Sequence, residues 1–224
     1  MNEHATPELP PAAPEPGPLR LSLSTAAVMA VFTLVFTGLM AGTYQATHTR
    51  IEASAEAEKL RLINEVLPPA RYDNALLRDV VRLDAAPELG LPKGASVWRA
   101  RRAGEPVALV MEAVAPDGYA GSIRLVLAVL HDGSLGGVRV VEHKETPGLG
   151  DYIDPLKDKV RDHPWIAQFT GLSPARVALA RWAVRKDGGD IAYRAGATIS
   201  ARAVTQAVAR AARFAQAERD RLYQ

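Results

Sequence analysis

The first marked pattern along the chain is an uninterrupted apolar run. From Leu21 to Thr47 there is no Asp, Glu, Lys, Arg or His, and the centre from Val28 to Phe36 is strongly apolar. About 20 such residues, at about 1.5 Å each along a helix, cross the hydrocarbon core of a bilayer. A cleaved signal peptide is the alternative, but the run exceeds the usual signal-peptide core and no clean Ala-x-Ala cleavage site follows it. The pattern favours a retained, single-pass transmembrane helix over residues 21–47.

The segments on either side of this run have different patterns. Residues 1–20 contain six prolines and three glutamates with almost no large apolar residue, which predicts a disordered tail. After the run, a charged segment ends at Pro68-Pro69, and its apolar positions recur near helical spacing. These positions are Ile51, Ala55, Leu62 and Val66. We therefore expect a helical stalk over residues 48–70, followed by a folded domain over residues 71–224.

Within that domain the pattern changes to runs rich in Val, Leu and Ile. Such runs predict strands at Pro106–Val114, Ile123–Leu130 and Val138–Glu142, the last two joined by a hairpin turn at His131–Ser134. A helix is predicted over Pro155–Phe169 and a further short strand over Arg181–Val184. One face of a terminal helix is marked by Val204, Val208, Ala211 and Ala215. Strands and helices do not alternate regularly, so the prediction is an α+β fold.

Composition narrows the possible chemistry. The formal net charge is only +2, from 27 basic and 25 acidic residues, which argues against a nucleic-acid partner. The absence of cysteine excludes thiolate-bound iron–sulfur clusters, c-type haem attachment, disulfides and a thiol nucleophile. The five histidines lack metal-ligand spacing, so no metal site is predicted. Any redox chemistry requires another cofactor.

The segment from Lys186 to Ser200 is the most informative for function. It places Gly196-Ala197-Thr198 directly before the terminal helix, after a polar turn. Gly196 permits a backbone conformation closed to other residues, and Thr198 presents a hydroxyl where unpaired helix N–H groups stabilise an anion. The position suits a phosphate-linked cofactor. The alternative is that Thr198 or Ser200 only caps the helix.

Five ordered motifs resemble one family. They are Tyr72-Asp73-Asn74, Asp117 to Ile123, Glu142 to Asp151, Asp187 to Asp190, and Gly196 to Ser200. Together they resemble the FMN-binding domain shared by the G subunit of the Rnf electron-transport complex and the C subunit of the sodium-pumping NADH:quinone reductase. The run Glu145 to Gly150 and the Asp-Gly-Gly-Asp sequence are more similar to the Rnf protein.

The resemblance implies a site. In this family the FMN phosphate is esterified to a threonine in a Ser/Thr-Gly-Ala-Thr sequence, which corresponds to Thr198 next to Gly196 and Ala197. This chain departs from the sequence at Ala195, where the family has a hydroxyl residue, and Ser200 is the alternative acceptor. The remaining expected flavin contacts are Thr146, Gly148, Leu149 and Tyr119, with Arg202 as a partner for the phosphate.

The implied function is electron relay by covalent FMN in a redox subunit of an ion-translocating oxidoreductase, a translocase. Catalysis then belongs to the assembled complex, and no residue of this chain is assigned a catalytic role. The implied partners are the other Rnf subunits, a flavin transferase and membrane lipid. Alternatives are a role like that of the C subunit of the sodium-pumping reductase, or a non-enzymatic, membrane-anchored regulatory protein.

The resemblance also implies a bacterial inner-membrane location with a periplasmic C-terminal domain. The flanking charges point the other way, because Arg20 precedes the apolar run while Arg50, Lys59 and Arg61 follow it. Long domains translocate largely regardless of such charges, so we expect the periplasmic orientation.

Overall fold

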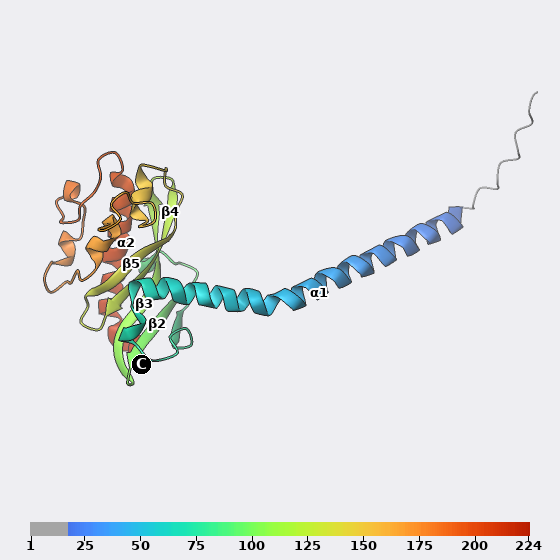
Figure 1. Cartoon of the computed structure of the whole chain (residues 1–224), viewed down its shortest axis with the longest axis horizontal. Helices are drawn as coiled ribbons and strands as arrows, with labels where there is room; N and C mark the ends of the chain where they lie inside the picture. The colour runs from blue at the N-terminus through green and yellow to red at the C-terminus, as the bar shows by residue number, and fades with distance from the viewer. Residues whose placement is uncertain (1–17) are drawn as a thin grey trace, which may run out of the picture. The chain divides into compact units, whose positions relative to one another are not determined.

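The computed structural model describes residues 18–224, so most of the predicted disordered tail lies outside the described residues. Its first element is one long helix, α1 (Pro18–Val66), drawn in blue and teal in Figure 1. Part of it, from Ser22 onward, is long and apolar enough to cross a membrane. The chain forms two compact units, which divide between Ser54 and Ala55.

The second unit is built on a five-stranded antiparallel sheet (Figure 1). Its strands are β1 (Val80–Leu83), β2 (Ala95–Arg102), β3 (Glu105–Gly118), β4 (Gly121–Leu130) and β5 (Leu135–Glu142). Each strand pairs with the one that follows it in sequence. The three predicted apolar strands are confirmed as parts of β3, β4 and β5, and the α+β prediction is confirmed with them.

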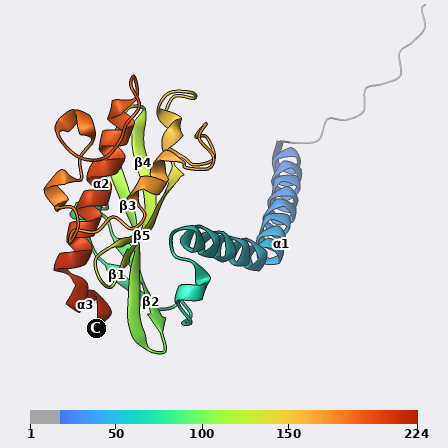
Figure 2. The same ribbon diagram turned by 60° about the vertical axis from the view of Figure 1, so that its left-hand side comes forward.

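The two faces of the sheet bury alternate residues, as a pleated strand requires. On β3, Leu109 and Met111 belong to the core beneath α2 (Thr198–Ala217), whereas Val110 belongs to the opposite core. That opposite core is completed by Ile63 and Val66 at the end of α1. Figure 2 shows α2 on one side of the strands and the end of α1 on the other.

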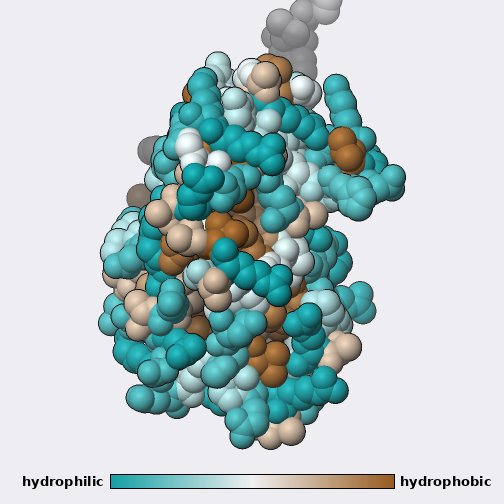
Figure 3. All heavy atoms as spheres, turned by 90° about the vertical axis from the view of Figure 1, so that its left-hand side faces the viewer, coloured by the Kyte–Doolittle hydropathy of each residue, from teal (hydrophilic) through white to brown (hydrophobic). Residues whose placement is uncertain are grey.

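The predicted terminal helix is confirmed as α2, followed by the short helix α3 (Arg219–Tyr223). The buried face of α2 is dominated by small residues: Ala201, Ala203, Ala207, Ala211, Ala212 and Ala215. Side chains of this size let a helix backbone approach the sheet closely. The face of the molecule shown in Figure 3 is mostly hydrophilic, with apolar residues visible between the hydrophilic ones.

Two predicted elements are wrong. Residues 155–169 form turns and one 3-10 helix, Trp165–Phe169, rather than an α-helix. The reason is local: the carboxylates of Asp154 and Asp158 accept hydrogen bonds from the backbone N–H groups of Leu156 and Val160, which stabilises turns.

The second wrong element is the predicted strand at Arg181–Val184. A 3-10 helix covers Leu179–Arg181, and Val184 makes a single isolated bridge with Ile191. Four residues with only one bridging partner do not form a strand. The segment instead joins the loop that leads to α2.

Candidate functional site

A cavity of about 260 Å³ lies beside the first turn of α2. We call it the Thr198 hollow. Three segments form its wall: the tip of the β3–β4 hairpin, the loop after β5 and the approach to α2. The lining residues are Tyr119, Glu145, Thr146, Leu149, Gly150, Gly196, Ala197, Ile199 and Ser200. The fold thus brings together predicted contact residues from motifs that are far apart in the sequence.

Thr198 is the first residue of α2, and Ala197 occupies the N-cap position. Ala197 provides no side-chain cap, so the backbone N–H groups at the start of α2 keep their capacity for an anion. Gly196, with φ of 83°, makes the left-handed turn before the helix. Within residues 18–224, no hydrogen bond ties the partly exposed Thr198 hydroxyl to another group.

Ser200 faces the protein interior rather than the solvent. It is 1% exposed, and its hydroxyl donates a hydrogen bond to the carboxylate of Glu145. Neither Thr198 nor Ser200 therefore acts as the helix cap. Of the two hydroxyls, only that of Thr198 is accessible from outside.

A network of polar groups around the buried Asp158 holds the turn that precedes Thr198. The Arg194 guanidinium pairs with the fully buried Asp158 carboxylate and lies 4.5 Å from the centre of the Tyr152 ring. The Tyr152 hydroxyl accepts a hydrogen bond from the Arg194 N–H at 3.2 Å and donates one to the Ala197 carbonyl at 3.4 Å. The N-cap residue of α2 is thereby tied to the loop around Asp158.

The surroundings of Asp158 lower its pKa. Burial alone would raise the pKa, but hydrogen bonds from the Val160 and Trp165 N–H groups and the Arg194 ion pair outweigh that effect. A carboxyl group whose pKa is lowered in the folded state stabilises the fold above its unfolded pKa.

Asp158→Asn is expected to reduce the free energy of unfolding by about 2–3 kcal/mol at pH 7, because the buried carboxylate loses its charge and its ion pair with the partly exposed Arg194. The difference from wild type should shrink as the pH falls below about 4, where the unfolded wild-type carboxyl takes up a proton. Urea titrations between pH 2 and 7 measure this. The exposed Asp162, changed to Asn, is the control, and an equal loss in both variants at pH 7 would contradict the role of the network.

Three predicted site residues do not line the hollow: Gly148, Arg202 and Thr198, the last of which lies beside it between Ala197 and Ile199. Gly148 is exposed on the adjacent loop, with φ of 77°, and its N–H donates to Asp151. Arg202 makes two hydrogen bonds with the Asp187 carboxylate, one of them at 2.7 Å. Arg202 therefore already has an anionic partner, and its hydrogen bond holds the pKa of Asp187 below its ordinary value.

Three lining residues were not singled out from the sequence: Glu145, Gly150 and Ile199. Glu145 and Gly150 belong to the recognised Glu-Thr-Pro-Gly-Leu-Gly motif, and Ile199 directly follows Thr198. The first two could have been selected with the rest of that motif. For Ile199, the sequence signal is its place beside Thr198.

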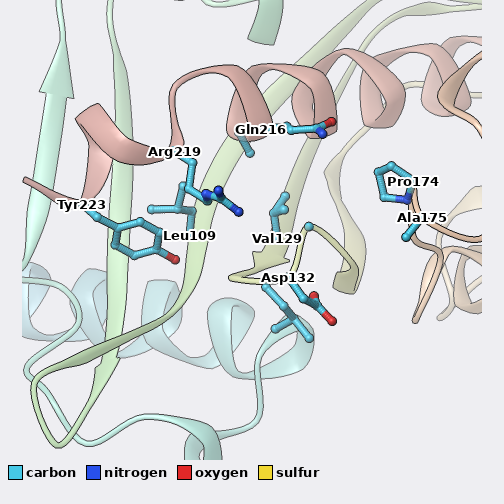
Figure 4. Close-up of a pocket in the computed structure, with 11 residues that line it drawn as sticks. Leu109, Val129, Asp132, Pro174, Ala175, Gln216, Arg219 and Tyr223 are labelled. Atoms are coloured by element: carbon cyan, nitrogen blue, oxygen red, sulfur yellow. The ribbon is translucent and has the colours of Figure 1, made fainter.

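A second cavity, of about 250 Å³, lies where the end of α2 and α3 meet the sheet. Figure 4 shows Arg219 and Tyr223 beside Leu109 and Val129 in this cavity. Burial raises the pKa of the Tyr223 phenol to about 12. None of the flavin contacts predicted from the sequence lines this cavity.

In residues 18–224 no group of three or more His, Asp or Glu converges as a metal site.

Comparison with known proteins identifies the family. Residues 118–213 match the family model described as the FMN-binding domain, and residues 21–66 match the RnfG N-terminal region. The matched N-terminal region contains most of the apolar helix, which indicates a membrane-anchored protein.

Three similar relatives are each named as the G subunit of an ion-translocating oxidoreductase complex. The Escherichia coli K12 protein is 45% identical over 189 residues, which cover 84% of this chain and 88% of the relative. The Pseudomonas aeruginosa protein is 43% identical, covering 91% of this chain and 92% of the relative. The Pseudoalteromonas atlantica protein is 39% identical, covering 88% of this chain and 89% of the relative. The chain therefore belongs to the family of G subunits of Rnf-type ion-translocating oxidoreductase complexes.

Proposed function

We propose that this chain carries FMN as a phosphoester on Thr198 and relays electrons within an Rnf-type complex. One observation carries the proposal: an accessible threonine hydroxyl stands at the start of α2, beside a hollow built from three motif segments. Bound FMN would supply the capacity to accept and donate electrons. The task of the protein is to hold and orient it.

The walls of the hollow suit a flat, largely apolar ring. Tyr119 is 67% exposed, Leu149 53% and Ile199 43%, although each is a large apolar or aromatic residue. Such side chains grouped around a cavity are typical of a ligand site. We assign them to the flavin ring, with Thr146 at the edge of the same wall.

The phosphate would lie where the helix favours an anion. No Lys or Arg lines the hollow, and the nearby Arg202 is paired with Asp187. A phosphate on Thr198 would therefore be stabilised by hydrogen bonds from the unpaired N–H groups at the start of α2 and by the helix dipole. Gly196 and Ala197 leave the approach to these N–H groups free of bulky side chains.

The proposal includes partners and a location. We propose that the chain assembles with the other subunits of the complex, that a flavin transferase attaches the FMN, and that α1 lies among the lipids of the bacterial inner membrane. The domain would occupy the periplasmic side. The domain boundaries that go with this proposal are a membrane helix over 21–47, a stalk over 48–70 and the FMN-binding domain over 71–224.

One experiment tests both the cofactor and the location. The full-length chain is produced in bacteria that contain a flavin transferase, and we expect a fluorescent band on a denaturing gel, because an ester survives unfolding. External protease added to spheroplasts should remove the fluorescent domain. A chain without fluorescence would contradict covalent FMN and favour a regulatory role. A fluorescent band protected until the cells are lysed would place the domain in the cytoplasm.

A further inference from the structure

We infer that Glu145 is a positioning residue of the Thr198 hollow: its carboxylate joins the three wall segments, and its charge lowers the reduction potential of a flavin held there. The inference rests on the proposed function for the flavin and on the structure alone for the joining of the segments. Glu145 belongs to the Glu145 to Gly150 run, but the family resemblance gave it no role of its own.

The contacts of Glu145 reach across the whole site. It is 4% exposed, and its two carboxylate oxygens have different partners. Oε2 accepts a hydrogen bond from the Ser200 hydroxyl on the first turn of α2, and Oε1 accepts one from the Ala120 N–H at 3.2 Å. The Glu145 N–H donates to Nδ1 of His143 at 3.1 Å, which holds the backbone of its own loop. One side chain thus connects the hairpin tip, the loop after β5 and α2.

Two glycines leave the space that Glu145 occupies. A Cβ on Gly118 would lie 2.8 Å from Glu145 Oε1 and 2.3 Å from the Gly121 carbonyl oxygen. A Cβ on Gly150 would lie 2.6 Å from Glu145 Oε2 and 2.5 Å from the Ser200 hydroxyl oxygen. A side chain at position 118 would collide with the Gly121 backbone and the carboxylate, and one at position 150 would collide with the carboxylate and the Ser200 hydroxyl. The glycines and Glu145 therefore form one packed unit.

The charge of Glu145 has no local counter-ion. In the described part of the chain none of the ion pairs involves Glu145, and no basic side chain lines the hollow. Its two donors are a neutral hydroxyl and a neutral N–H, which stabilise an ionised carboxylate without cancelling its charge. A fixed negative charge in a partly buried site opposes the arrival of electrons on a neighbouring group. The reduction potential of the flavin is therefore lowered.

Exchange of backbone hydrogens tests the positioning without any flavin. In the full-length chain lacking FMN, Glu145→Ala should increase exchange by at least about tenfold at Ala120, whose N–H loses its acceptor, and over residues 202–204, whose N–H groups bond to the carbonyls of the first turn of α2. Glu145→Gln keeps the size and one acceptor oxygen, so it should restore part of the protection. Glu142→Gln, an exposed glutamate at the end of β5, is the matched control. Unchanged exchange in Glu145→Ala would overturn the positioning role.

The reduction potential tests the charge. In FMN-loaded protein, Glu145→Gln should shift the flavin potential to a more positive value, while Glu142→Gln should leave it near wild type. Equal potentials in Glu145→Gln and wild type would overturn the electrostatic part, because a merely structural role predicts no such shift in the size-matched variant. If wild type carries no FMN, the proposed function fails together with the electrostatic part, and the exchange experiment still decides the positioning role.

Discussion

Thr198→Val is expected to abolish the covalent FMN and to leave the fold nearly unchanged. Valine keeps the branched shape of threonine but lacks the oxygen that would form the ester. The Thr198 hydroxyl makes no hydrogen bond within residues 18–224, so its removal should change the free energy of unfolding by less than about 1 kcal/mol. Mass spectrometry of the peptide covering residues 195–202 should show the FMN adduct in wild type and none in the variant.

Ser200→Ala is the matched control, because Ser200 carries the nearest alternative hydroxyl on the same turn. We expect the adduct to persist, since this hydroxyl is buried and already donates to Glu145. The free energy of unfolding should fall by about 1–3 kcal/mol, because the Glu145 carboxylate loses a donor. An adduct that persists in Thr198→Val and disappears in Ser200→Ala would instead make Ser200 the acceptor.

The second large effect is expected at Gly189, in the loop before α2. A Cβ there would lie 1.9 Å from the Ala183 carbonyl oxygen and 2.3 Å from its carbon, and neither backbone atom can rotate away. Gly189→Ala should therefore cost about 3 kcal/mol in unfolding free energy. Thermal unfolding followed by circular dichroism measures the loss.

The neighbouring Gly188 separates steric collision from backbone strain. Gly188 has φ of 83°, but a Cβ on it would meet nothing within 4 Å. Gly188→Ala should cost only about 1–2 kcal/mol, the strain of alanine in the left-handed region. Equal destabilisation by the two substitutions would show that the contact with Ala183 is not the cause.

Apolar patterning predicted β3, β4, β5 and α2, but it did not predict the short β1 or the longer β2. Strand β2 carries Arg99 and Arg101, and a charged run does not resemble a buried strand. Asp79, which lies outside any strand, accepts hydrogen bonds from both guanidinium groups and so provides the missing counter-charge. Such neutralisation depends on tertiary contacts, and spacing within the strand does not reveal it.

In the site, too, some residues could be predicted from the sequence and others only from tertiary contacts. Thr198 and the residues around it could be selected because they form a contiguous motif resembling a known family. The function of Glu145 depends on Ser200, which lies 55 residues further along the chain. The availability of Arg202 likewise depends on a carboxylate at Asp187, 15 residues away. A single sequence contains these residues but does not reveal which of them meet.

The order of the sheet has a consequence for folding. Because every strand pairs with its successor in sequence, the sheet can form by successive closures of short loops, which favours rapid folding. Helix α2 belongs to the last part of the chain and packs across strands that precede it. Thr198, the acceptor that we propose, therefore takes its position only when α2 packs on the sheet. Flavin attachment to this turn would consequently report the completion of folding, and chains stalled before that step would remain unlabelled.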